Sequence, residues 1–165
     1  VVLYGSEIPQ MNPIIDRNKK IISIDGGCGV KKDGQLNLLI IPDINCSVDD
    51  ISHMSYDEIP FVYAVEEQSS NDESIYISWL NKEIRILDKG EEFSFVDHIK
   101  SGRRLYLPNA YIRNETECLD YTDYLLPVKQ GDKLSVIFKS SKGCIAKKDG
   151  TIGWYCGKTS KQQPV

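Results

Sequence analysis

Apolar residues in this chain occur in short runs separated by Gly, Asp and Asn, and no window keeps the 3.6-residue period of a helix. Such runs have the length of strands, so the sequence predicts a mainly β protein with little helix. The runs at 21–24 and 35–41 are nearly continuous, which is typical of strands that are covered on both faces. We expect these two strands to pair. Because a hairpin cannot provide such cover alone, they should belong to a larger sandwich.

Further strands are indicated along the rest of the chain. Phe61–Val65 has the composition of a strand, and residues 75–80 and 83–87 alternate around Asn81-Lys82, which predicts a hairpin. Five short strands follow, at about 104–107, 125–128, 133–139, 143–147 and 151–155. Short strands at regular spacing, joined by turns that contain Gly, favour a small barrel that hides its edges by closure.

The distribution of charge divides the chain into segments. Ten acidic and no basic residues lie within 33–81, whereas 129–161 holds eight Lys and only two Asp. Uneven charge of this kind often separates modules. We therefore expect a two-stranded segment at residues 1–45 and a small barrel at residues 101–165. Between them, residues 46–100 should form a β-rich connecting region with one helical turn near 48–51.

The overall composition excludes some function classes. The 165 residues include 20 basic and 24 acidic ones, which gives a net charge of −4 and argues against a nucleic-acid partner. No apolar run approaches the length of a membrane span, so no membrane partner is expected. The five Cys are odd in number and scattered, without a C-x-x-C motif, and the N-terminal residues lack the pattern of a signal peptide. These features predict free thiols and a cytoplasmic protein.

The N-terminal segment carries a family resemblance. Residues 12–16, 20–29 and 33–40 spell NPIID, KIISIDGGCG and DGQLNLLI. This wording resembles the C-terminal end of the catalytic domain of bacterial calcineurin-like metallophosphoesterases, which are related to Ser/Thr protein phosphatases. The resemblance covers about residues 1–45 and implies C-terminal strands of a phosphoric ester hydrolase. It places Gly26, Gly27 and Cys28 at the rim of the phosphatase groove.

The metal-ligand motifs of that family do not occur in this sequence. The family spells them D-x-H, G-D-x-x-D-R-G, G-N-H and G-H, and the chain's two His, His53 and His98, fit none of them. An intact member of the family implies two divalent metal ions, but we expect none in this chain and no catalytic residues. The chain alone is therefore predicted to be inactive. Its expected partner is a missing N-terminal catalytic region or a second copy of itself.

The C-terminal segment carries a second resemblance. Residues 131–136, 143–147 and 150–155 are similar to the bacterial SH3-like barrel, whose pattern is G-D-x-(L/V)-x-V, a strand, and a closing G-x-x-G-W. The long acidic stretch 114–123 departs from a minimal version of that barrel. Together the two resemblances imply a mainly β chain with remnant strands of a metallophosphatase sandwich, a β-hairpin middle and a C-terminal SH3-like barrel.

Aromatic residues concentrate in the expected barrel, and they have two interpretations. They either line a peptide groove, flanked by acids that would steer a basic or Pro-rich peptide, or they form the barrel core. The candidate groove residues are Tyr111, Tyr121, Tyr124, Trp154, Tyr155, Glu117 and Asp120. Two functions remain open. The chain is either the C-terminal portion of a bacterial metallophosphoesterase with an SH3-like accessory module, or a stand-alone peptide- or protein-binding module without enzymatic activity.

Overall fold

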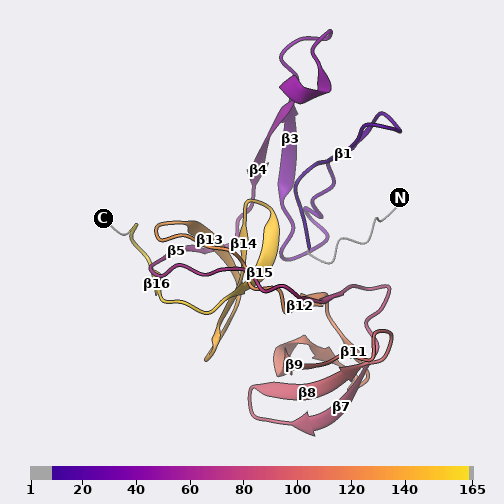
Figure 1. Ribbon diagram of the computed structural model, residues 1–165, viewed down its shortest axis with the longest axis vertical. Helices are drawn as coiled ribbons and strands as arrows, with labels where there is room; N and C mark the ends of the chain where they lie inside the picture. The colour runs from indigo at the N-terminus through magenta and orange to yellow at the C-terminus, as the bar shows by residue number, and fades with distance from the viewer. Residues whose placement is uncertain (1–8, 164–165) are drawn as a thin grey trace.

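The structure, a computed structural model, describes residues 9–163. These residues form short strands and two 3-10 turns (Figure 1), which confirms the prediction of a mainly β protein. In chain order the strands are β1 (Ile14–Asp16), β2 (Ile21–Ser23), β3 (Leu36–Ile40), β4 (Ser52–Tyr56), β5 (Phe61–Ala64), β6 (Tyr76–Ile77), β7 (Ile84–Lys89), β8 (Phe93–His98), β9 (Arg104–Pro108), β10 (Ile112–Arg113), β11 (Glu117–Cys118), β12 (Tyr121–Thr122), β13 (Lys133–Ser140), β14 (Gly143–Lys148), β15 (Thr151–Tyr155) and β16 (Thr159–Ser160). The 3-10 turns are η1 (Val48–Asp50), where the sequence predicts a helical turn, and η2 (Asn109–Tyr111).

A five-stranded antiparallel sheet has the strand order β15-β14-β13-β5-β16. The β14–β15 hairpin turns at Asp149 and Gly150, whose φ angles of 49° and 77° suit a primed two-residue turn. Because β5 lies between β13 and β16, the sheet combines strands from the 46–100 and 101–165 segments. The edge strands β15 and β16 do not pair with each other. Residues 9–163 therefore contain no closed barrel, and the SH3-like barrel expected at 101–165 is not present as a closed unit.

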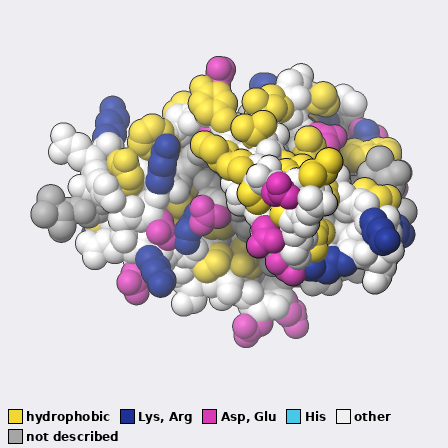
Figure 2. Space-filling view, turned by 90° about the horizontal axis from the view of Figure 1, so that it is seen from above, with side chains coloured by type: hydrophobic (Ala, Val, Ile, Leu, Met, Phe, Trp, Pro, Cys, Tyr) yellow, Lys and Arg dark blue, Asp and Glu magenta, His cyan; other side chains and the backbone are white. Residues whose placement is uncertain are grey.

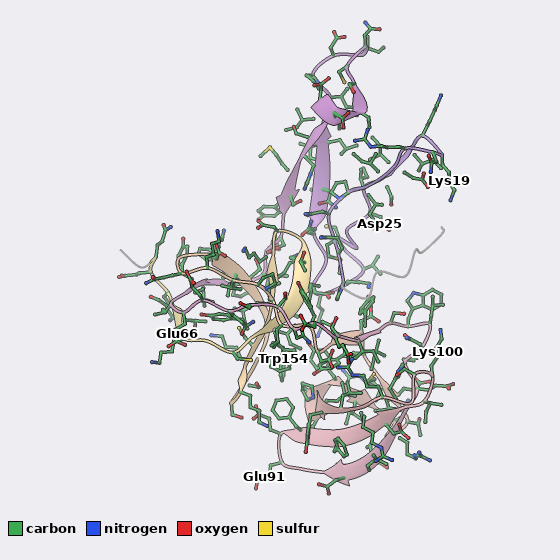
Figure 3. All side chains as sticks on the ribbon, in the orientation of Figure 1. Lys19, Asp25, Glu66, Glu91, Lys100 and Trp154 are labelled. Carbon is green, nitrogen blue, oxygen red and sulfur yellow. The ribbon has the colours of Figure 1, made fainter. Side chains whose placement is uncertain are left out.

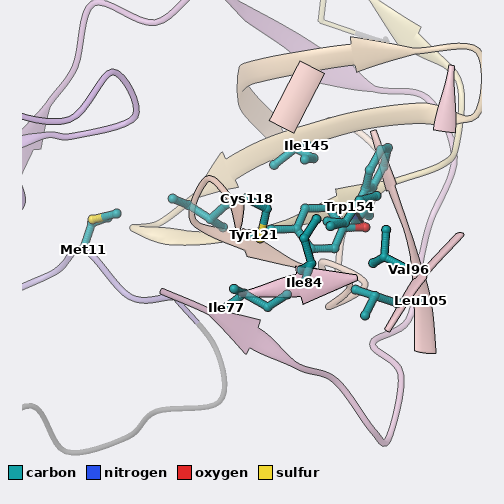
Figure 4. Close-up of a cluster of buried hydrophobic side chains, with 11 residues drawn as sticks. Met11, Ile77, Ile84, Val96, Leu105, Cys118, Tyr121, Ile145 and Trp154 are labelled. Atoms are coloured by element: carbon teal, nitrogen blue, oxygen red, sulfur yellow. Dashed lines mark hydrogen bonds between the residues drawn. The ribbon is translucent and has the colours of Figure 1, made fainter. Parts of the chain in front are cut away.

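Two hydrophobic clusters stabilise this part of the molecule. The larger one joins the five-stranded sheet to the three-stranded sheet β7-β8-β9, and Figure 4 shows its side chains around Trp154. Its members include Val96 and Leu107, whose side chains are fully buried. The second cluster includes Leu134 and Tyr155, which are also fully buried. Because burying one large aliphatic side chain stabilises a fold by about 1.5–3 kcal/mol, these clusters account for much of its cohesion.

The hairpin expected around Asn81-Lys82 is wrong. β6 pairs with β12, whereas β7 pairs with β8 through a turn in which the Gly90 N–H donates to the Phe93 carbonyl over 3.0 Å. The side chain of Asn81 instead closes a local turn, because its Oδ1 accepts a hydrogen bond of 2.6 Å from the Ser78 N–H. Asn81-Lys82 thus lies in a loop between strands of different sheets, and the local sequence does not encode which strands these pair with.

One other expected pairing and one expected strand also differ from the structure. Residues 21–24 and 35–41 do not pair as a hairpin: β2 pairs with β1, and β3 pairs with β4. No regular strand forms at 125–128, where the chain makes single bridges from Leu125 and Val128. Pro127 lies between these bridges and lacks an N–H to continue a ladder.

The hairpins β1–β2 and β3–β4 project together from the remainder of the molecule (Figure 1). We call residues 12–57 the arm and residues 58–163 the body. At the tip of the arm, Ser47 and Asp50 form a capping box around η1. An ion pair between Arg17 and Asp49 links the two hairpins there.

Candidate docking surface

One face of the β3–β4 hairpin carries apolar side chains that are turned outward. Leu36 lies opposite Tyr56 and Leu38 lies opposite Met54, so these four side chains share a face with Ile40. All five are exposed, from 41% for Ile40 to 62% for Met54 and Tyr56. We call this set the apolar arm face. Figure 2, which views the molecule from the arm end, shows hydrophobic side chains gathered there.

The opposite face of the same hairpin is polar and buried at Asn37, and it carries the half-buried Leu39 further along the strand. Asn37, which is 5% exposed, donates from Nδ2 to the carbonyls of Met11 at 2.7 Å and Ile24 at 3.1 Å. Its Oδ1 accepts hydrogen bonds of 2.8 Å from Gln35 Nε2 and from Ser55 Oγ. The hairpin therefore turns the face with Asn37 toward Met11 and Ile24 and exposes its more apolar face, whereas an ordinary two-layer arrangement buries the more apolar face.

Ion pairs join the arm to the body. Lys147, which is 3% exposed, contacts Asp57 at 2.9 Å and donates to the Asp33 carbonyl at 3.0 Å. Lys31 contacts Asp120 at 2.7 Å. Desolvation opposes the charge of Lys31, but the hydrogen bond to Asp120, together with Coulombic interactions with Tyr76, Asp120 and Asp33, raises the pKa of Lys31 above its ordinary value. These contacts fix the direction in which the apolar arm face points.

The expected groove-rim residues Gly26, Gly27 and Cys28 form a tight turn against the start of β3. A Cβ on Gly26 would lie 2.4 Å from the Gln35 carbonyl oxygen, and Gly27 has a φ of 74°, so both positions require glycine for backbone reasons. The Cys28 side chain is exposed. The turn thus has a structural reason of its own, which neither requires nor excludes a place beside a phosphatase groove.

The aromatic residues expected to line a peptide groove are mostly core residues. Tyr121, Tyr124, Trp154 and Tyr155 are all buried, which agrees with the core interpretation and leaves them inaccessible to a peptide. Trp154 Nε1 donates to Tyr121 Oη at 3.1 Å, and Tyr121 Oη donates to the Tyr106 carbonyl at 3.0 Å. Burial raises the pKa of Tyr121 above its ordinary value. The half-buried Tyr111 packs edge-on against Tyr121, with ring centroids 5.8 Å apart.

The two acids expected to flank that groove are bound within the molecule. Glu117 contacts Lys82 at 2.7 Å, and Asp120 contacts Lys31 as described above. The two residues lie in different contacts and do not form one acidic site. A basic peptide would therefore have to displace both lysines, so this region does not offer a ready acidic groove.

The two remaining expectations concern metals and membranes. Within residues 9–163, no group of three or more His, Cys, Asp or Glu side chains is placed to hold a metal ion. The described residues by themselves do not fit the two-metal centre that the family resemblance implies. No helix among them is long and apolar enough to cross a bilayer.

The apolar arm face is the feature that sequence reasoning missed. The sequence predicts no strand at 52–56, although Met54 and Tyr56 belong to β4 and complete the face. The only local signal is that Met54 and Tyr56 alternate with the polar residues His53 and Ser55, and this signal for a strand is weak.

Comparisons of the chain with protein-family models, with curated proteins and with solved structures found no match.

Proposed function

We propose that this chain is the C-terminal part of a metallophosphoesterase, in which the apolar arm face packs against the catalytic domain. The observation that carries the proposal is the outward-facing set Leu36, Leu38 and Met54. Leu36 and Leu38 fall inside the segment that resembles the end of the phosphatase domain. Strands of that sandwich are covered on both faces, whereas here one face of β3 has polar cover and the other has none among the described residues.

The energetics support a covered arm. Removing five half-exposed apolar side chains from water would contribute on the order of 5 kcal/mol, which is comparable to the stability of a whole domain. The arm is attached to the body by hydrogen bonds and ion pairs such as Lys147–Asp57, so the apolar face is free to serve another layer. In this proposal the metal ligands come from a preceding segment, and the body is an accessory module.

The test joins this chain to its preceding coding segment. We expect that segment to supply the four ligand motifs, and the joined protein to hydrolyse p-nitrophenyl phosphate with added Mn²⁺, while the chain alone does not. Leu38→Asp should lower the thermal stability and the activity of the joined protein. Leu80→Asp is the matched control, because Leu80 is similarly exposed but lies in the loop after β6.

Two results would overturn the proposal. One is a preceding segment without the ligand motifs, and the other is a joined protein that does not hydrolyse the ester. A second copy of the chain is the competing occupant of the apolar arm face. A dimer of the joined protein that Leu38→Asp dissociates, without any effect on activity, would favour the second copy over a catalytic domain.

A further inference from the structure

A groove of about 690 Å³ opens at one end of the five-stranded sheet, on the body. It is lined by the start of β5 with Pro60, by residues 136–139 of β13, and by residues 159–161 around β16. Phe61 contributes a ring that is 47% exposed. The groove is thus built from main chain and apolar side chains of three neighbouring strands, and it is separate from the apolar arm face.

The groove contains an unfilled strand position. β5 pairs with β13 only through Lys133–Ser135, and the Val136 N–H donates to the Pro60 carbonyl at 2.7 Å. The residues that precede Pro60 do not continue β5 along β13. Phe138–Ser140 therefore pairs with β14, after a bulge at Ile137, but has no strand on its other side among the described residues. An unpaired strand edge is a template for an added strand.

The charged side chains that line the groove all have the same sign. Lys139 and Lys161 are exposed at the groove, and neither forms an ion pair with another described residue. The residues that line the groove include no Asp or Glu. Beside it, the Lys133 ammonium lies 4.0 Å from the centroid of the Phe61 ring. The closest turn, at Ser141, already accommodates Glu92, which accepts a 2.9 Å hydrogen bond from the Ser141 N–H.

We infer that this groove binds an extended acidic peptide, which adds as a strand beside Ile137–Ser140. The main chain of the peptide pairs with the free edge of β13, one side chain packs on Phe61, and its carboxylates face Lys139 and Lys161. The preferred charge is opposite to that of the basic or Pro-rich peptide expected from the sequence. The reason is that Glu117 and Asp120 are engaged by lysines, whereas the charged side chains that line the groove, Lys139 and Lys161, are positive.

The binding experiment uses three labelled probes with the full chain: an eight-residue peptide of alternating Asp and Val, the same peptide with Lys in place of Asp, and the Asp-Val peptide N-methylated at alternate positions. Fluorescence anisotropy should detect the Asp-Val peptide, with affinity at least about tenfold higher than for the Lys-Val peptide. The N-methylated peptide should lose binding, because it cannot complete a strand ladder although its charge is unchanged.

Charge-reversal variants at two places distinguish binding in the groove from non-specific electrostatic attraction to the protein. Lys139→Glu combined with Lys161→Glu should weaken binding of the Asp-Val peptide about tenfold or more. Lys100→Glu should leave it unchanged, since Lys100 lies in the turn after β8, away from the five-stranded sheet (Figure 3). Equal binding of the Asp-Val and Lys-Val peptides, undiminished binding of the N-methylated peptide, or equal effects of the two sets of variants would each overturn the inference. A groove occupied by a second copy, detected as a dimer that the probe does not dissociate, would also overturn it.

Discussion

The arm and the body use their apolar residues in opposite ways. The body buries Leu107, Leu134 and Trp154 in two clusters between its sheets. The arm exposes Leu38 and Met54 and instead buries a polar network. The body therefore carries the cohesion of the described structure, whereas the arm keeps its position through directional contacts and leaves its apolar surface available. Exposed apolar patches of this kind are typical of interaction surfaces, and the contact proposed for the arm rests on this one.

The largest expected difference between the two regions follows from cavity formation. Leu107→Ala in the body should lower the free energy of unfolding by about 2–5 kcal/mol, because it leaves a cavity in the larger cluster. Leu38→Ala on the arm should change it by less than about 0.5 kcal/mol. Urea denaturation followed by Trp fluorescence measures both. Similar losses for the two variants would contradict the contrast between arm and body.

The ion pair at the base of the arm should have the next largest effect. Lys147→Met leaves the Asp57 carboxylate, which is 15% exposed, without its cation, so we expect a loss of about 3 kcal/mol. The double variant Lys147→Met with Asp57→Leu should recover most of that loss, because no buried charge then remains. In the single variant Lys147→Met, amide hydrogen exchange should show that the amide of Asn37, in the arm, loses protection before the amide of Val96, in the body. A double variant no more stable than the single one would show that packing, rather than charge, matters at this position.

The buried polar network around Asn37 in the arm provides a smaller effect. Asn37→Leu has a similar volume but removes the hydrogen bonds that Asn37 donates to the Met11 and Ile24 carbonyls and the acceptor of the Ser55 hydroxyl proton, so we expect a loss of about 1–3 kcal/mol. Asn45→Leu, at the exposed tip, is the matched control. Denaturation of both variants checks the prediction. Equal stability of the two would mean that the network does not hold the arm in place.

The smallest effect concerns pH and belongs to the body. Burial, with smaller contributions from Asp120 and Glu117, raises the pKa of the Cys118 thiol from 9.0 to about 12. Since the thiol must stay protonated in the folded state, its contribution to stability is complete below pH 9 and is lost progressively as pH rises toward 12. Cys118→Ala should therefore reduce the decline in stability between pH 9 and 11, by at most about 1 kcal/mol per pH unit. Cys28→Ala, at the exposed turn of the arm, should leave that decline unchanged.

Local sequence determined most strands and several turns of this protein. The runs that became β3, β5, β13, β14 and β15 were predicted within a residue or two, because β-branched and apolar residues between turn formers favour extended backbone. The turn at Asp149 and Gly150 follows from the ability of Gly and Asp to adopt positive φ. The candidate phosphatase and peptide sites came from resemblance, and the structure places most of the aromatic peptide-site residues in the core.

Only the tertiary structure decided which strands pair and which faces are covered. The alternation along β3 defines two faces, but it does not say which face is buried; the partners of Asn37, which come from residues 11, 24, 35 and 55, settle that. Likewise, nothing in Phe61–Ala64 specifies insertion between β13 and β16, strands that lie about 70 to 100 residues further along the chain. Backbone pairing is chemically the same for any extended segment, so its partner depends on long-range packing. For that reason the apolar arm face and the basic groove emerged from the structure and not from the sequence.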